Sequence, residues 1–371
     1  MKREGNLYKE VVDWKNLLLA AKKARRGKRY RFDVSEFHWD MERELISIQQ
    51  ALRDKTYNPG CYRSFEITDP KRRMISAAPY RDRVVHHAIC NIIEPILDRS
   101  FVFDSYACRR GKGQLAALKR ARFYMTKYKY VARTDIRKYF ASIDHDVLME
   151  NLKRKFKDPD LLWVIERIVR TQFPRQERPS FFPGDDLLSH AERNCGLPLG
   201  NQTSQLFGNF YLDRLDHRLK EEIGIPGMIR YMDDIVLFAN SKQQLWDALA
   251  WMEGELKKIR LRMHERKTSV TTTKDGIRFL GHHVQTSTLR LFPESVIRLR
   301  RRFRHLYKEL EAGAADSETV RQVIASYWGF VQISGYRKTF RQIINDYSLW
   351  EVLRSTGRSA DECSAVHTTS H

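Results

Sequence analysis

One segment of the chain reads Met228-Ile229-Arg230-Tyr231-Met232-Asp233-Asp234-Ile235-Val236-Leu237-Phe238-Ala239. Two apolar runs, residues 228–231 and 235–239, enclose the adjacent carboxylates Asp233 and Asp234, a pattern that predicts two strands joined by a tight turn. Neighbouring carboxylates repel each other, and a divalent cation with oxygen ligands relieves that repulsion. The segment therefore predicts a β-hairpin with metal ligands at its tip, with a solvated acidic loop as the alternative.

A third carboxylate, Asp135, ends another apolar run at residues 130–135, which we expect to form a strand. Two divalent ions a few ångströms apart stabilise the attacking and leaving oxygens of an in-line phosphoryl displacement. Three carboxylates brought together by neighbouring strands would hold such a pair of ions. The sequence therefore predicts phosphoryl-transfer chemistry that depends on Mg²⁺.

The rest of the chain alternates between helical and strand-like patterns, which favours an α+β catalytic body followed by a small helical domain. Strand-like patterns occur at residues 62–78 and in short runs up to residue 280. Helical patterns occur at residues 8–24, 37–52, 80–97, 147–156, 161–173, 203–222, 245–259 and from residue 293 onward.

Positive charge dominates the composition, with 67 Lys and Arg against 46 Asp and Glu, a formal net charge of +21. An excess of this size favours a polyanionic partner, and interleaved aromatic residues favour nucleic acid. We expect a cytoplasmic protein without a membrane span, because no long apolar run or secretory signal is present. The five scattered cysteines do not suggest a zinc site or disulfides.

Several motifs in this order resemble the palm of reverse transcriptases, and the resemblance covers roughly residues 53–333. They are Asp135 at the end of its strand, the segment Gly196-Leu197-Pro198-Leu199-Gly200, and Tyr231-Met232-Asp233-Asp234. The resemblance implies a right-hand polymerase of α+β class, with fingers, an RRM-like antiparallel palm sheet and a helical thumb. The expected limits are an N-terminal helix and basic segment at 1–30, fingers with part of the palm at 31–130, palm at 131–285, thumb at 286–354 and a disordered tail at 355–371.

The resemblance also implies roles for the acidic residues. Asp135 would ligate both of two Mg²⁺ ions, for which Mn²⁺ is a substitute, and the carbonyl of Ile136 would be an extra ligand. Asp233 would be the second principal ligand, and Asp234 a more weakly engaged neighbour. The family adds deoxynucleotides to a growing strand, so dNTPs, template RNA and an RNA–DNA hybrid are the implied partners.

Further motifs imply nucleotide contacts. Arg72 and Arg73 resemble the fingers cations that hold the incoming triphosphate, and we favour Arg73 as the inward-facing one. Phe140 stands where the family places a steric gate against ribonucleotides, with a core aromatic as the alternative. Lys267 stands where a lysine protonates the leaving pyrophosphate, with an ordinary surface lysine as the alternative. The segment 279–281 resembles the primer-grip hairpin.

The motif at 196–205 narrows the subfamily, because Leu199 replaces the Gln of retroviral and group II intron enzymes. Gly200 lets the backbone approach the nucleotide closely. The motif with Leu199 resembles that of the diversity-generating retroelement enzymes, which belong to the bacterial group II intron-like lineage. These enzymes copy adenines with errors and use a small basic helical accessory oligomer. A simply tolerated Leu is the alternative. An anti-phage defence enzyme with a dedicated non-coding RNA and an RNA-binding maturase are the alternative functions, and the gene would be bacterial or phage-encoded.

The first expected thumb helix is rich in arginine, and successive arginines on one helix track the phosphates of an RNA–DNA duplex. A solvated helix face is the alternative. The candidate nucleic-acid-binding residues are Arg298, Arg301, Arg302 and Arg304.

Overall fold

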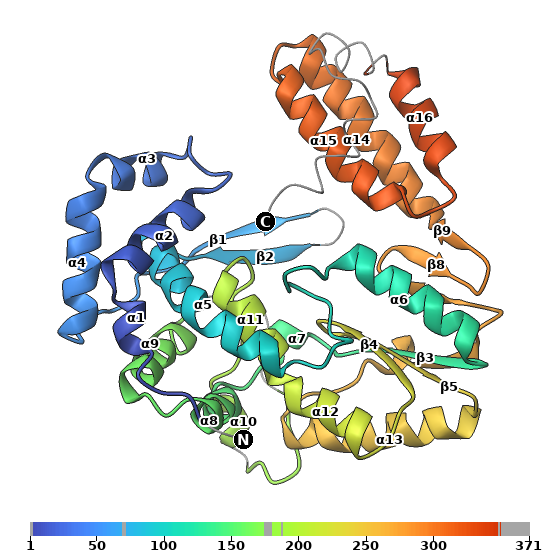
Figure 1. The fold of residues 1–371 in the computed structure, drawn as a ribbon, viewed down its shortest axis with the longest axis horizontal. Coiled ribbons are helices and arrows are strands. Elements are labelled where there is room, and N and C mark those ends of the chain that lie inside the picture. Colours follow the sequence, from blue (N-terminus) through green and yellow to red (C-terminus); the bar gives the residue numbers. More distant parts are fainter. Residues whose placement is uncertain (1–2, 69–71, 174–179, 187, 348, 350–371) are drawn as a thin grey trace.

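The computed structural model describes residues 3–68, 72–173, 180–186, 188–347 and 349. Its elements form an α+β fold in which an N-terminal group of helices lies beside a four-stranded sheet and a C-terminal group of helices lies above that sheet (Figure 1). The expected fold class is therefore confirmed. Across the described residues, no helix is both long and apolar enough to cross a lipid bilayer.

The N-terminal helices pack around one long central helix. They are α1 (Tyr8–Val11), α2 (Trp14–Arg25), α3 (Phe32–Trp39), α4 (Met41–Arg53) and the central α5 (Tyr80–Ser100). The single helix expected at residues 8–24 is interrupted, because the Asp13 side chain accepts hydrogen bonds from the N–H groups of Lys15 and Asn16 and caps α2. The helix expected at 37–52 is likewise divided, at Asp40, into α3 and α4.

A two-stranded hairpin projects from this group, formed by β1 (Arg63–Ile67) and β2 (Arg73–Ala77) in antiparallel register. It confirms the strands expected at residues 62–78. The Ser76 N–H donates to the carbonyl of Leu199 at 3.1 Å, so the hairpin is joined to the turn that follows residue 198. Lys71, the first cation of the expected fingers motif, lies outside the described residues.

The central sheet is antiparallel, with strands in the order β4 (Gly227–Tyr231), β5 (Asp234–Ala239), β3 (Tyr130–Asp135) and β6 (Ser269–Thr272). Successive side chains of a strand point to opposite faces. Ala132 and Leu237 therefore join the large core on one face, while Val131 and Val236 join a second core on the other. Both faces are buried, which explains why β5 reads as a continuous apolar run.

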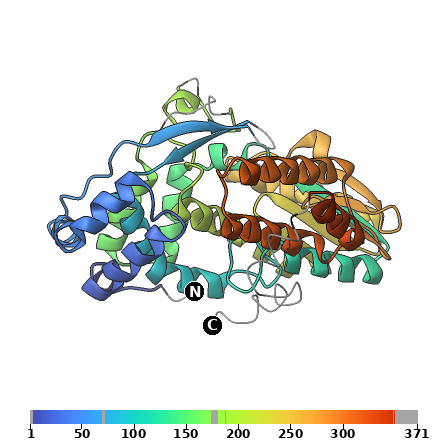
Figure 2. The ribbon, with the colours of Figure 1, turned by 90° about the horizontal axis from the view of Figure 1, so that it is seen from above.

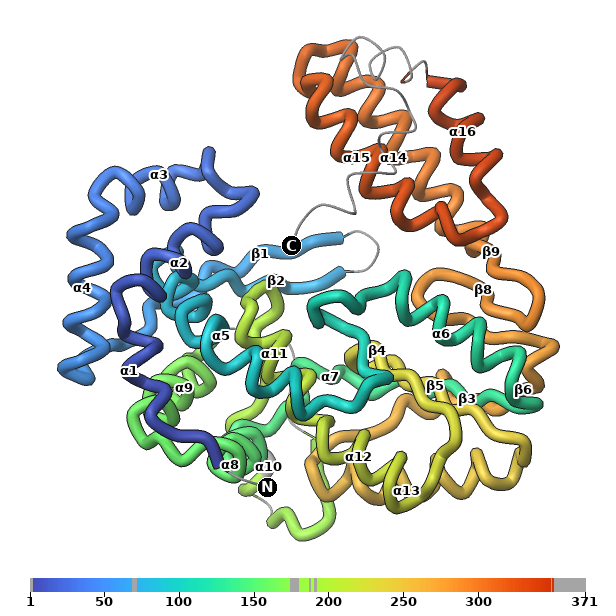
Figure 3. Tube along the Cα trace, viewed as in Figure 1, coloured from blue at the N-terminus to red at the C-terminus, as the bar shows by residue number. Residues whose placement is uncertain are grey.

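Helices cover the two faces of this sheet. The large core contains residues of α11 (Gln202–Tyr211), α12 (Asp213–Glu221) and α13 (Lys242–Lys258), and the second core contains α6 (Gln114–Lys127). The helix expected at 203–222 is broken at Leu212 between α11 and α12. The sequence pattern did not reveal α6. Figure 3 traces the chain from α6 directly into β3.

Shorter elements complete this body. They are α7 (Tyr139–Ser142), α8 (His145–Lys155), α9 (Pro159–Val169), α10 (Ser189–Glu192), the 3₁₀ turn η1 (Glu265–Lys267), β7 (Ile277–Phe279), β8 (His282–Val284) and β9 (Leu289–Leu291). The last three strands form a separate antiparallel sheet that leads to the C-terminal helices.

The C-terminal helices α14 (Pro293–Glu311), α15 (Ser317–Val331) and α16 (Arg337–Asp346) have a core of their own, built around Phe303 and Phe340. Seen from above, they overlie the central sheet, at the opposite end of the molecule from the N-terminal helices (Figure 2). The helices α1 and α2, by contrast, share the large core with α5. The domain limits given above remain a prediction, and the expected tail at 355–371 lies outside the described residues.

Candidate active site

The strand register brings the three candidate aspartates together. Asp135, the last residue of β3, lies directly opposite Asp234, the first residue of β5. The Ile136 N–H donates to the carbonyl of Asp233 at 3.1 Å, which fixes the end of β3 to the hairpin turn. Residues far apart in the sequence therefore converge at one end of the sheet, because a six-residue antiparallel pairing leaves them no other place.

The turn between β4 and β5 is strained. Met232 has a φ of 59°, a left-handed backbone conformation that residues other than glycine seldom adopt. The carbonyl of Met232 accepts a hydrogen bond from Nη1 of Arg230 at 3.2 Å. Arg230 is fully buried, and its Nε donates to both carboxylate oxygens of Asp216, at 2.9 and 2.7 Å. This buried pair supports the turn that carries Asp233.

Sequence reasoning did not identify Arg230 and Asp216. The available signal was an arginine in the middle of a strand that is otherwise apolar, since a charge in such a position must be paired. Asn209 of α11 completes the arrangement, because its side-chain oxygen and its carbonyl each accept from Arg230 at 3.1 Å.

Cations offset part of the negative charge at the aspartates. Lys267 Nζ lies 2.9 Å from Asp135 Oδ1, and Arg133 donates to the two oxygens of Asp234 at 3.0 and 3.1 Å. Burial, and then the charge of Asp135, raise the pKa of Asp233 to about 6. Burial also raises the pKa of Asp234, although the hydrogen bonds from Arg133 oppose that shift.

The carboxylates of Asp135 and Asp233 repel each other. A hard divalent cation, which prefers oxygen ligands, would relieve this repulsion, so the pair suits such an ion. Within the part of the chain that the structure describes, no three acidic, His or Cys side chains already stand in a ligand arrangement. Arg133 engages both oxygens of Asp234. The ligand roles of Asp234 and of the Ile136 carbonyl therefore stay predictions.

Two hollows meet at the aspartates. The larger, of about 1360 Å³, is lined by Asp135, Asp233, Lys267 and Arg73, together with further cations of the loop before η1. The other, of about 940 Å³, is lined by all three aspartates and by Leu280 and Gly281 of the expected primer grip. The fold thus places a carboxylate cluster, a cation from the β1–β2 hairpin and the expected primer-grip turn around one space.

Arg72 and Arg73 differ in their surroundings. Arg73 lines both hollows, whereas the Arg72 Nε lies 3.7 Å from Glu66 on the exposed side of the hairpin. This geometry accords with our preference for Arg73. The triphosphate-binding role of either arginine remains a prediction.

Three further candidates lie away from the lining of these hollows. Phe140 is half-buried against Gly208 of α11, where an added Cβ would lie 3.2 Å from its ring. Leu199 is also half-buried. Gly200 has a φ of 111°, and a Cβ there would lie 3.0 Å from Ile75 of β2, so glycine is required at this close approach. Their nucleotide contacts stay predictions.

The candidate arginines of α14 have separate surroundings. Arg298, Arg301 and Arg304 are exposed, while Arg302 is half-buried and lies 3.3 Å from Glu309. Arg298 donates to the Ser295 hydroxyl at 3.3 Å and Arg304 to the Tyr347 hydroxyl at 3.4 Å. The nucleic-acid contacts of all four arginines remain a prediction.

Comparison with known proteins places this site in context. Residues 67–284 match the family model described as reverse transcriptase (RNA-dependent DNA polymerase). Protein YkfC of Escherichia coli is 23% identical over 284 residues, which cover 65% of this chain and 71% of that protein. The group II intron-encoded protein LtrA of Lactococcus lactis is 21% identical, over 66% of this chain and 50% of LtrA.

Among solved structures, apo telomerase from Candida tropicalis, truncated from the C-terminal domain, is similar, with a TM-score of 0.46 and 12% identity over 67% of this chain and 60% of that chain. The chain spans only about half the length of LtrA. The family match nevertheless covers more than half of the chain and includes all three aspartates of the site. The chain therefore belongs to the reverse transcriptase family, the RNA-dependent DNA polymerases.

Proposed function

We propose that this protein copies an RNA template into cDNA by nucleotidyl transfer with two Mg²⁺ ions bound at Asp135 and Asp233. The observation that carries this proposal is the register that sets Asp135 opposite Asp234 beside the turn holding Asp233. When bound, the ions would stabilise the attacking and leaving oxygens of the displacement.

The chain's own residues supply the remaining parts of the reaction. Arg73 extends from the β1–β2 hairpin into the hollow and binds the triphosphate, since a guanidinium matches phosphate oxygens with two parallel hydrogen bonds. Lys267 stabilises Asp135 and donates its proton to the leaving pyrophosphate. Leu280 and Gly281 border the same space and position the primer end. Phe140 excludes the 2′-hydroxyl.

We place the enzyme in a diversity-generating retroelement, and the residue that supports this is Leu199. Its side chain can pack but cannot hydrogen-bond, so it checks the template pair less strictly than the Gln of related enzymes. In that setting the enzyme uses a structured template RNA and a small basic helical accessory oligomer. A defence enzyme with its own non-coding RNA would share the same catalytic residues, and cDNA that copurifies with the protein distinguishes the two.

The substitution Asp233→Asn tests the polymerase assignment. It removes one metal-binding charge and keeps the shape of the side chain, so dNTP incorporation on a primed RNA template should fall by at least a hundredfold while RNA affinity stays within about twofold. Asp54→Asn, which removes an exposed carboxylate at the end of α4, is the matched control and should retain full activity. Wild-type incorporation rates in Asp233→Asn would refute the metal role of Asp233, and a wild-type protein that binds RNA without incorporating dNTPs would favour a maturase-like RNA-binding role.

A further inference from the structure

One stretch of the chain carries much of the excess positive charge, and of its cations only Arg133 takes part in the site described above. Residues 105–134 contain nine Lys and Arg and no Asp or Glu. The stretch includes α6, whose apolar face packs on the central sheet through Leu118, Ala121 and Met125. The opposite face is turned to solvent. Its exposed cations, together with those that flank the helix, are Arg110, Lys119, Arg122, Lys127 and Lys129.

These five cations have no acidic partner within ion-pair distance among the described residues. Elsewhere many surface cations are paired, as Arg154 on α8 is with Glu150. The unbalanced charge therefore calls for an anionic partner outside the chain.

Two large aromatic side chains stand in the same area and are unusually exposed. Phe103, in the loop before α6, is 64% exposed, and Phe123, on α6, is 50% exposed. The guanidinium of Arg120 lies between them, 5.5 Å from the centre of the Phe103 ring and 5.3 Å from that of Phe123. The two rings are therefore no further apart than the sum of these distances, which is within reach of one short run of bases.

The arrangement is held in place from below. Arg120 donates through Nε to Asp104 at 2.9 Å, and Asp104 is buried, with Lys220 at 2.7 Å as a second cation. The loop is anchored to the edge of β4, because the Arg230 N–H donates to the carbonyl of Asp104 and the Tyr106 N–H donates to that of Arg230, both at 2.9 Å. On the outer side, Lys112 Nζ lies 3.3 Å from the centre of the Phe103 ring.

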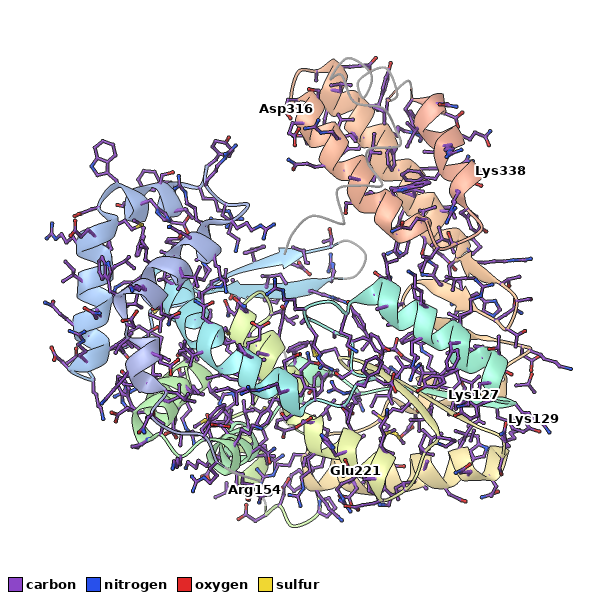
Figure 4. All side chains as sticks on the ribbon, in the orientation of Figure 1. Lys127, Lys129, Arg154, Glu221, Asp316 and Lys338 are labelled. Atoms are coloured by element: carbon purple, nitrogen blue, oxygen red, sulfur yellow. The ribbon has the colours of Figure 1, made fainter. Side chains whose placement is uncertain are left out.

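The position of α6 connects this area with the polymerase site. At the start of the helix, Gln114 Nε2 donates to the carbonyl of Leu280, in the expected primer-grip turn, at 2.7 Å. Fourteen residues of helix then extend for about 21 Å. Figure 4 shows Lys127 and Lys129 at the edge of the sheet region farthest from the N-terminal helices. The cations of α6 thus follow a helix that begins next to the expected primer-grip turn and ends at the outside of the molecule.

We propose that this region, the α6 surface (Phe103, Lys112, Arg120, Phe123 and the five unpaired cations), binds an unpaired segment of the RNA outside the catalytic space. Bases stack on the two phenylalanine rings, and the cations contact the phosphates. Every base has a face that can stack, so the binding is tolerant of sequence. This inference rests on the proposed function only in taking the RNA to be the template.

The test compares two RNA substrates with the full-length protein. One is a short RNA–DNA duplex whose RNA strand extends only a few template nucleotides beyond the primer 3′ end, and the other carries a 20-nucleotide unpaired RNA extension, placed at either end in separate substrates. The double variant Phe103→Ala/Phe123→Ala should bind the extended substrate about tenfold more weakly. A loss of affinity of this order is expected when one stacked base loses its aromatic partner. Binding of the short-overhang duplex and extension of its primer should stay within twofold. Unchanged affinity for both extended substrates would overturn the inference.

Conservative variants separate base stacking from other kinds of contact. Phe103→Leu/Phe123→Leu keeps apolar area and removes the aromatic faces, so it should behave like the alanine variant, whereas Phe103→Trp/Phe123→Trp should retain binding. If the leucine variant still binds the extended substrate as the wild-type protein does, apolar area and not base stacking accounts for the binding, and the inference is overturned.

Charge variants provide a second readout. Lys119→Ala/Lys127→Ala should lower the slope of log affinity against log salt for the extended substrate by about 0.7 for each lost phosphate contact. Lys153→Ala/Arg154→Ala, on α8 far from the α6 surface, is the matched control and should leave the slope unchanged (Figure 4). If the wild-type protein fails to extend the primer of the short-overhang duplex, the proposed function fails, while the binding comparison still decides the α6 surface.

Discussion

Arg230 and Asp216 form a fully buried ion pair beside the turn that carries Asp233. Burial raises the pKa of Asp216, and the charge of Arg230 opposes that shift. A buried ion pair is in general only weakly stabilising, because removing two charges from water offsets their attraction. Its effect is positional, because the same guanidinium holds the carbonyl of the strained Met232. The pair therefore fixes the shape of the turn more than it stabilises the fold.

Breaking this pair should be costly. Arg230→Met leaves Asp216 charged and unpaired in the core, and we expect it to lower the free energy of unfolding by about 3–5 kcal/mol. Arg230→Met/Asp216→Leu removes both charges and should recover most of that stability, but it should not recover primer extension, because the support of the Met232 carbonyl is lost. Urea denaturation and primer extension measure the two effects, and full activity in the double variant would contradict the positional role.

The raised pKa of Asp233 predicts how stability depends on pH without metal. Between the ordinary carboxyl pKa near 4 and about 6, the unfolded chain has lost the Asp233 proton and the folded chain has kept it, so stability falls as pH rises through this window and is level above it. We expect a loss on the order of 2 kcal/mol. Melting in EDTA at pH 4.5 and 7.5 measures it.

Asp233→Asn serves as the control for this pH effect, since it lacks the titrating group and should not lose this part of the stability. Added Mg²⁺ should raise the melting temperature of the wild-type protein at pH 7.5 more than that of Asp233→Asn. An equal Mg²⁺ response in both proteins would argue against a metal ligand at Asp233.

Lys267 allows a comparison of charge with proton donation. Lys267→Arg keeps a cation near Asp135 but holds its proton too tightly to give it up, so kcat should fall by about 10²-fold with little change in KM for dNTP. Lys267→Ala, which removes the charge as well as the proton, should lower kcat and raise KM for dNTP. Single-turnover incorporation across pH provides the measurement, and wild-type kinetics in both variants would support the reading of Lys267 as an ordinary surface lysine.

Leu199→Gln tests the retroelement assignment. If a side chain without hydrogen-bonding groups loosens the check on the template pair, the glutamine variant should make severalfold fewer errors opposite template adenines. Leu199→Met, which keeps an apolar side chain of similar volume, should leave the error spectrum as it is. Deep sequencing of cDNA from a defined RNA template measures both, and identical spectra in all three proteins would count against the assignment.

The strands that carry the three candidate aspartates were the elements best predicted from the local sequence. The strand at Tyr130–Asp135 has the bounds expected, because an apolar run ends at a charged residue that must reach solvent or a ligand. Helix breaks were missed at Asp13 and Asp40, since apolar periodicity continues across a residue whose backbone leaves the helix.

The sequence was least informative where neighbours decide the outcome. The helix α6 was not recognised, because basic residues interrupt the apolar positions that pack on the sheet. Arg230 gave no clue to its partner, since Asp216 lies on a different element and the two meet only in the folded core. Tertiary packing, rather than local preference, determines both features.

The hydrogen bond from Ser76 to the carbonyl of Leu199 has a consequence for fidelity. Arg73 lies three residues before Ser76 on the same short strand, so Arg73 and the residue that bonds Leu199 share one support. On the roles proposed here, a nucleotide that seats poorly against the template also pulls on the strand that carries its triphosphate anchor. Selection of the correct base and retention of the bound nucleotide would then depend on the position of the same strand.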